Sequence, residues 1–250
     1  METGPILEYS HRLLAAFSGL LILSSAVAGL VRLPRVRWIA IPPVVAGVLL
    51  VEVSYFGAVV VLRGLAPGWA ALDVGSALLV VALMVATAVT ASIYKNNPSI
   101  PDRLSFKTPF TRLAMAAVAA IYVVLTSGIL VSGKNSISGC LGWPIYSLRL
   151  FQLDGPTMGN TLRWTLSLVG IVLVVAVLLQ AWRKKVDQPA VFQLARWLGM
   201  ITLLEALVQV FLLVFGYQVS LMIIYSVTAA VFWALLVAVL VRASLYEVGS

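Results

Sequence analysis

Residues 8–31 read EYSHRLLAAFSGLLILSSAVAGLV, a short polar head followed by an uncharged apolar run. A helix of about 20 apolar residues is long enough to cross the hydrocarbon core of a bilayer. The polar head contains Glu8, Arg12 and the single histidine of the chain, His11. Because residues three and four positions apart share a helix face, the carboxylate, imidazole and guanidinium lie together. Ionisable side chains at the mouth of a membrane helix usually serve a function, so this stretch predicts both a membrane fold and a site.

The composition indicates that the apolar run is one of several membrane spans. Hydrophobic residues make up 62% of the 250 and charged residues 10%, which is more apolar surface than a soluble domain can bury. The N-terminal sequence METGPILEYS lacks the basic region of a cleavable signal, so we expect the first span to be retained. Cys140 is the only cysteine, which excludes an intrachain disulfide and a thiolate metal cluster.

Seven apolar segments are each long enough to cross a bilayer with some tilt. The sequence therefore predicts an all-α integral membrane protein with seven transmembrane helices. Most of the links are short, which favours antiparallel neighbours. The predicted spans are residues 11–31, 38–62, 70–94, 111–132, 161–182, 190–215 and 218–242.

The basic residues that give the net charge of +8 lie near the ends of the spans. They therefore indicate the membrane topology rather than binding to a nucleic acid. By the positive-inside rule, the side that collects most basic residues is cytoplasmic. We therefore expect a multi-pass protein of the cell membrane, with its N-terminus outside and its C-terminus in the cytoplasm. The basic residues of the predicted inner side are Arg32, Arg35, Arg37, Lys95, Arg103, Lys107, Arg112, Arg183, Lys184, Lys185, Arg196 and Arg242.

The chain also contains an internal repeat. When residues 11–23 are aligned with residues 162–174, Arg12 falls opposite Arg163, and the following helices bring Asp73 opposite Tyr225. Helices 1–3 and 5–7 are thus predicted to be parallel copies with helix 4 between them, forming two pseudo-symmetric bundles. The predicted sections are residues 1–110, residues 111–160 with helix 4 and a long outer loop, and residues 161–250.

The repeat predicts that four positions share one depth near the outer surface. His11 and Leu162 open helices that start outside, and Asp73 and Tyr225 lie about one turn inside such helices. Facing side chains at one level are how helical bundles build cofactor sites. Only the first repeat offers plausible ligands, namely His11 and Asp73. The outer loop, with its aromatic residues, is expected to lie on the membrane surface or to cap the bundle.

Several motifs resemble the heme A synthase family, the CtaA-type cytochrome oxidase assembly proteins. They are EYSHR, VEVSYFGAVVVLRGLAPGWAALDVGSALL at 51–79, TSGILVSG at 126–133 followed by CLGWP at 140–144, and AAVFWALLVA at 229–238. The resemblance implies two four-helix halves, each holding a heme between a pair of histidines. It also implies oxidation of a methyl group of heme O to the formyl group of heme A, with Glu8 as the catalytic residue.

The departures from the family pattern are as informative as the match. Of the four family histidines only His11 remains, and Asp73, Leu162 and Tyr225 stand at the other three positions. The second loop cysteine of the family would fall near Tyr146, and the helix that precedes the EYxHR motif is missing. The second heme site therefore cannot be bis-histidine.

At most one heme is accordingly expected, of b or o type, with His11 as its axial ligand, alone or with Asp73 or Tyr225. Arg12 and Arg163 could then meet the heme propionates, although contact with lipid phosphates is equally compatible with the sequence. In the competing interpretation, His11 is an interfacial polar residue paired with Glu8.

Two functions follow from these alternatives. The first is heme handling in cytochrome oxidase assembly, with oxidation of a heme side chain if the protein is catalytic. The second is a non-catalytic subunit or assembly factor of a membrane respiratory complex that keeps only the fold. Glu52 and Glu205 lie near the middle of apolar helices and must be protonated or paired. They are the only support for a third idea, a proton-coupled carrier.

Overall fold

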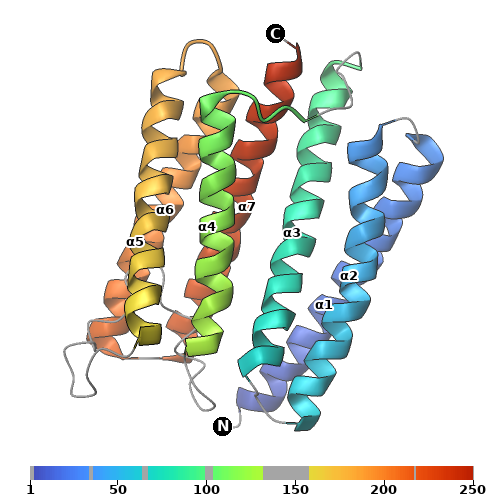
Figure 1. Ribbon diagram of the computed structural model, residues 1–250. Coiled ribbons are helices and arrows are strands. Elements are labelled where there is room, and N and C mark those ends of the chain that lie inside the picture. Colours follow the sequence, from blue (N-terminus) through green and yellow to red (C-terminus); the bar gives the residue numbers. More distant parts are fainter. Residues whose placement is uncertain are drawn as a thin grey trace.

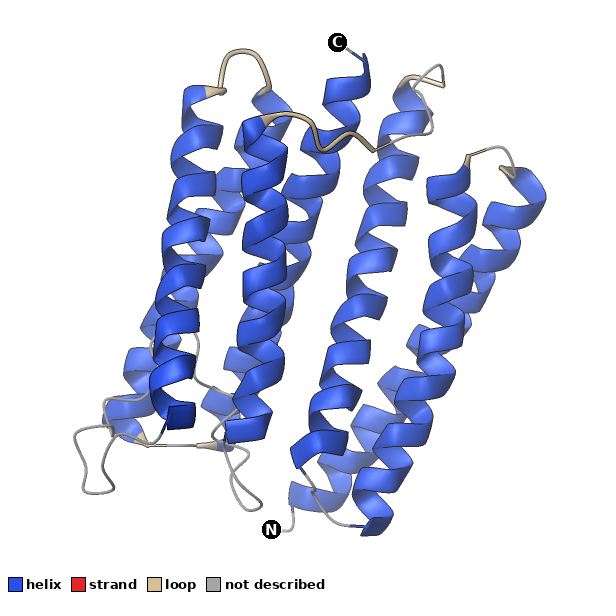
Figure 2. Cartoon of the chain, in the orientation of Figure 1, coloured by secondary structure: helices blue, strands red, loops and turns tan. Residues whose placement is uncertain are grey.

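The structure, a computed structural model, describes residues 3–33, 36–63, 67–98, 104–131, 158–216 and 218–249. These residues form seven long helices that run side by side, with consecutive helices antiparallel (Figure 1). The same residues contain no strand, which confirms the predicted all-α class (Figure 2). The helices are α1 (Thr3–Arg32), α2 (Arg37–Arg63), α3 (Pro67–Asn96), α4 (Pro109–Val131), α5 (Met158–Arg183), α6 (Pro189–Phe215) and α7 (Val219–Gly249).

Each of these seven helices carries a stretch that is long and apolar enough to cross a membrane. The prediction of seven spans is therefore confirmed. The helices are longer than the spans, because they continue past the apolar region at one or both ends. In particular, α1 begins at Thr3, so the EYSHR sequence lies inside the helix rather than ahead of it.

Proline and glycine mark several helix ends. Pro67, Pro109 and Pro189 are the first residues of α3, α4 and α6, where the missing N–H would have no acceptor within the helix. Gly216 follows the last residue of α6 with φ 79°, a conformation that strains any other residue. This glycine allows the tight link between α6 and α7.

Two prolines inside α2 mark the place where α1 comes closest. Pro42 and Pro43 have no N–H to donate to the carbonyl oxygens of Trp38 and Ile39. A Cβ atom added at Gly29 of α1 would lie only 2.8 Å from the Ile39 oxygen. Close helix contacts in membranes use small residues in this way, so Gly29 sets the spacing between α1 and α2.

The helices pack as two units that meet along α3 (Figure 1). The three-helix half consists of α1, α2 and α3, with a small core around Ile22, Ala46 and Val80. The four-helix half consists of α4 to α7, and α4 packs there against α5 and α7. Its core is larger and draws on all four helices. The parallel internal repeat remains a prediction.

Trp233 of α7 joins the two halves. Its indole Nε1 donates a hydrogen bond of 2.8 Å to the Leu78 carbonyl oxygen of α3, and its ring lies 6.1 Å from that of Tyr122 in α4. A second link comes from the α3–α4 connection, where the Ser105 amide donates to the Ser244 carbonyl oxygen of α7. These contacts tie α3 and the α3–α4 connection to α4 and α7.

The bundle has two ends, which we name by their helices. At the motif end, α1, α3, α5 and α7 begin; at the far end, α2, α4 and α6 begin (Figure 1). The links predicted to be outside belong to the motif end, and those predicted to be inside belong to the far end. Which end faces the cytoplasm stays a prediction. Residues 132–157, with Cys140 and most of the expected outer loop, lie outside the described residues.

Candidate functional site

The EYSHR residues occupy the first turns of α1. Glu8, His11 and Arg12 therefore have the helical spacing that places three side chains on one face. Tyr9 and Arg12 are exposed on the bundle surface. The side chains of Glu8 and His11 lie outside the described part of the chain, so their shared face remains an expectation.

Asp73 lies in α3, and its carboxylate points toward α2. It is half-buried, and its Oδ1 atom is 3.9 Å from the place where a Cβ atom on Gly57 would stand. An alanine at position 57 would make ordinary van der Waals contact with the carboxylate, so α2 passes close to Asp73 at this glycine. Asp73 is the seventh residue of α3, which begins at the motif end. This position agrees with the predicted depth of Asp73, and its role as a ligand remains a prediction.

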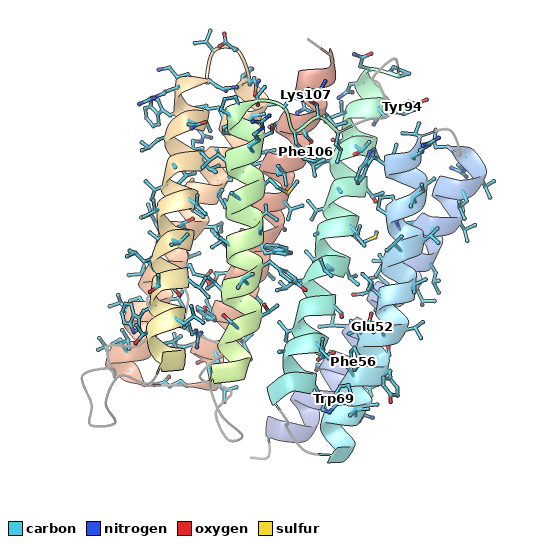
Figure 3. The ribbon with its side chains drawn as sticks, viewed as in Figure 1. Glu52, Phe56, Trp69, Tyr94, Phe106 and Lys107 are labelled. Atoms are coloured by element: carbon cyan, nitrogen blue, oxygen red, sulfur yellow. The ribbon has the colours of Figure 1, made fainter. Side chains whose placement is uncertain are left out.

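An acidic and aromatic group lies one to two turns from Asp73. Figure 3 shows Glu52, Phe56 and Trp69 together on α2 and α3, toward the motif end. The rings of Phe56 and Trp69 are 5.5 Å apart. Glu52 is half-buried. The three-helix half therefore brings two carboxyl side chains, Glu52 and Asp73, to its motif-end portion.

Arg163 belongs to the four-helix half and is buried, with 2% of its surface exposed. Its Nη1 atom donates to the Gly128 carbonyl oxygen of α4 at 3.4 Å. Gly128 lies in the last turn of α4, where carbonyl oxygens have no donor within the helix and the helix dipole is negative. Arg163 thus caps α4. Arg12, its predicted counterpart in the repeat, is exposed, so the two arginines have different environments.

The two positions that carry family histidines in the second repeat also differ. Leu162 is 60% exposed, whereas Tyr225 is 2% exposed and packs against Val208 and Leu212 of α6. A leucine side chain cannot ligate iron. The described residues of the four-helix half therefore offer a single oxygen, the Tyr225 hydroxyl, where the family pattern has two imidazoles.

Glu205 is buried inside the four-helix half, with 3% of its surface exposed. The Thr228 hydroxyl lies beside its carboxyl group. That hydroxyl donates its proton to the Tyr225 carbonyl oxygen at 2.9 Å, and neither Glu205 oxygen makes a well-formed hydrogen bond within the described residues. The prediction that this carboxyl lies within a membrane helix is confirmed, and an ionised carboxylate in such surroundings costs several kcal/mol.

Two further buried polar side chains of the four-helix half were not predicted from the sequence. Ser167 of α5 and Gln209 of α6 are almost fully buried. Each follows an identified residue by one turn, as Ser167 follows Arg163 and Gln209 follows Glu205. This spacing was the signal that could have revealed them. We call the resulting set the polar stripe; it consists of Arg163, Ser167, Glu205, Gln209, Tyr225 and Thr228.

The polar stripe occupies two matching levels of the four-helix half. Counting from the motif end, Arg163 and Tyr225 are the sixth and seventh residues of α5 and α7, while Ser167 and Thr228 are each the tenth. At about 1.5 Å per residue the members of each pair have similar depths. All four are buried, so the interior of the four-helix half contains polar side chains at these two levels.

Within the described residues, no three His, Cys, Asp or Glu side chains come together in a way that holds a metal ion. The His11 side chain and Cys140 are not among them. The site residues predicted from the sequence thus divide between the halves. Asp73 and the backbone of the EYSHR turn belong to the three-helix half, and Arg163 and Tyr225 belong to the four-helix half.

The comparisons with known proteins agree with the resemblance in the motifs. A family model described as cytochrome oxidase assembly protein, of the COX15-CtaA type, matches residues 3–237. No curated protein and no solved structure matches the chain. The family match covers all seven helices, including the EYSHR turn and most of α7.

Proposed function

Because the chain belongs to the cytochrome oxidase assembly protein family, we propose that it handles heme in the membrane through a single site in its three-helix half. The family implies a role in oxidase assembly and heme A biosynthesis. The single site is proposed because the two halves differ at the positions where the family has heme-ligating histidines. His11 is kept in α1, whereas the four-helix half has an exposed Leu162 and a packed Tyr225.

The interior of the four-helix half does not suit a second heme. Arg163 and Gln209 are buried at the level of Tyr225 and fill space that a macrocycle needs. Tyr225 itself is held between α6 side chains. With no imidazole at the family's ligand positions and with these buried polar side chains, this half is better suited to packing than to cofactor binding.

In the three-helix half, His11 would hold the heme iron through a neutral imidazole nitrogen. Asp73, whose carboxylate lies beside Gly57 of α2, is the candidate for a second ligand. Arg12, which is exposed on α1, is the proposed contact for a propionate, since guanidinium groups pair with carboxylates in a bidentate way. A bound heme would supply the redox chemistry.

Glu8 is proposed to hold or move a proton next to His11. The two residues are one helical turn apart in α1, and a carboxylate at this distance orients an imidazole and raises its basicity. If the protein is catalytic, this proton transfer accompanies oxidation of a heme side chain. If it is not, the same turn binds heme for an oxidase or for another assembly factor.

The test is a pyridine hemochrome measurement on protein purified from heme-replete cells. We expect about one heme per chain in the wild type and a loss of most of it in His11→Ala. Ser10→Ala is the matched control, because Ser10 is the exposed neighbour of His11 in the same turn. Asp73→Asn should keep heme but shift the Soret band if Asp73 is the second ligand.

The outcomes separate the two functions. Wild-type protein without a Soret band, or equal heme in wild type and His11→Ala, would rule out the ligand role and leave a non-catalytic assembly subunit. Two hemes per chain would contradict the interpretation of the four-helix half. Unchanged heme content in Tyr225→Phe is expected, because Tyr225 belongs to the half without a proposed site.

A further inference from the structure

A cavity at the far end lies away from the proposed heme site. It has a volume of about 560 Å³ and is bounded by α2, α3 and the connection between α3 and α4. Pockets of roughly 300 to 1,000 Å³ are typical of sites for small ligands. The residues around this far-end cavity are Arg37, Trp38, Ile41, Pro42, Val45, Leu83 and Leu104.

The walls of the far-end cavity change character with depth. Arg37 and Trp38 stand in the first turn of α2, at the end of the span. Ile41 lies about one turn deeper than Arg37, and Val45 about two turns deeper, which is about 12 Å along the helix at 1.5 Å per residue. Leu83 of α3 lines the same part of the cavity. The cavity therefore offers a cationic and aromatic mouth at membrane-surface depth and an apolar floor within the membrane.

The described charged residues of α1, α2 and α3 at this end are basic. Among the described residues, the far-end turns of α1, α2 and α3 carry Arg32, Arg37 and Lys95 and no acidic residue. Lys107, on the α3–α4 connection, adds a further exposed cation at this end (Figure 3). Basic pockets between transmembrane helices attract anionic head groups by this arrangement.

We propose that the far-end cavity is a binding site for an anionic phospholipid. The phosphate lies against the Arg37 guanidinium, the glycerol region lies beside the Trp38 ring, and one acyl chain runs along Ile41 and Val45 toward Leu83. Tryptophan favours head-group depth because its ring is apolar and its N–H is polar. Arginine suits a phosphate because its planar fork matches the oxygens.

The chemistry of the walls argues against other occupants. None of the described lining side chains is an iron ligand, which argues against a heme held there by its metal. A neutral amphiphile would use the apolar floor but would gain nothing from Arg37. An anionic phospholipid has an acidic head group that matches Arg37 at the mouth of the cavity and an acyl chain that matches its apolar floor.

Native mass spectrometry of the purified full chain, exchanged with phosphatidylglycerol or phosphatidylcholine of identical acyl chains, tests the proposal. We expect one tightly retained phosphatidylglycerol per chain and several-fold weaker retention of phosphatidylcholine. Arg37→Gln should reduce phosphatidylglycerol retention about fivefold, the effect of one basic side chain near an anionic surface. Arg32→Gln is the control, because this exposed arginine of the same end does not line the cavity, and it should reduce retention much less than Arg37→Gln.

A second pair of variants tests the acyl-chain wall without changing charge. Ile41→Trp should fill the cavity and reduce retention of both lipids, whereas Val48→Trp, on the exposed surface of α2 outside the cavity, should not. Equal retention of the two lipids by the wild type would overturn the proposal. Equal losses of phosphatidylglycerol in Arg37→Gln and Arg32→Gln would also overturn it. The proposal would likewise be wrong if the purified chain retained a neutral amphiphile that Ile41→Trp displaced. Heme content is unaffected in every case, so this test is independent of the proposed function.

Discussion

The two halves of the molecule differ in how much of each helix is covered. In the membrane stretch of α7, 50% of the residues are buried within the protein, against 17% for α1. The four-helix half buries Arg163, Gln209 and Trp233 almost completely, and the three-helix half has only a small core. The family's distinctive EYSHR turn thus lies on the least covered helix. Stability and ligand chemistry are separated between the two halves, and four substitutions test that separation.

The largest effect is expected at the contact between the halves. Trp233→Ala leaves a cavity in the core and removes the hydrogen bond to the Leu78 oxygen, so it should lower the free energy of unfolding by about 3 kcal/mol. Chemical unfolding in mixed micelles, followed by circular dichroism, measures the change. The control is Trp182→Ala, which removes an exposed tryptophan and should cost under about 0.5 kcal/mol. Equal losses in the two variants would refute the difference in burial.

Arg163 and Arg12 provide the next comparison. Arg163→Gln removes a buried guanidinium from the Gly128 oxygen, which should destabilise the protein by about 2 kcal/mol because charged hydrogen bonds in buried positions are costly to lose. Arg12→Gln, at an exposed position of α1, should change stability by less than about 0.5 kcal/mol. The same unfolding experiment reads both. A larger loss in Arg12→Gln would mean that the EYSHR turn also stabilises the fold.

The three-helix half has one sensitive point of its own, Gly29. Gly29→Ala places a Cβ atom 2.8 Å from the Ile39 oxygen, and separating α1 from α2 should cost about 1 kcal/mol. Gly47→Ala is the matched control in α2, because no atom lies within 4 Å of the added Cβ. It should be neutral or slightly stabilising, since alanine favours a helix. Thermal unfolding of both variants decides whether the close approach is real.

The smallest effect is expected at Glu205. Gln keeps the shape of a carboxyl group and carries no charge, so Glu205→Gln should change stability by under about 0.5 kcal/mol if the buried side chain is neutral. Glu52→Gln is the parallel change in the three-helix half, at a half-buried position. A loss above about 1.5 kcal/mol in Glu205→Gln would instead indicate an ionised group with a cationic partner.

The spans were predictable because length and hydropathy depend on sequence alone. A run of about 20 apolar residues has few alternatives to a membrane helix. The helix ends were less predictable than the spans, since polar residues belong to a helix as readily as to a link. The apolar span was placed at residues 11–31 with the EYSHR residues on the same helix, and α1 extends further, to Thr3.

The environment of each polar side chain could not be read from the sequence. Arg12 and Arg163 occupy equivalent places in the predicted repeat, and the sequence allowed contact with a propionate or a lipid phosphate for both. The structure shows Arg12 exposed on α1 and Arg163 buried, with its guanidinium against the Gly128 oxygen of α4. The far-end cavity was equally hidden, since Leu83 and Leu104 reach it from elements far from Arg37 in sequence.

The hydrogen bond from Trp233 to the Leu78 oxygen joins residues 155 positions apart, and this separation has a consequence for biogenesis. A ribosome adds about 5 to 20 residues per second, so α3 waits on the order of ten seconds in the bilayer before α7 emerges. During that interval the face of α3 that later meets Trp233 is covered by lipid or by the insertion machinery. We expect the three-helix half to be inserted first and the bundle to close only when the last helix arrives, which makes α7 the step that completes the protein.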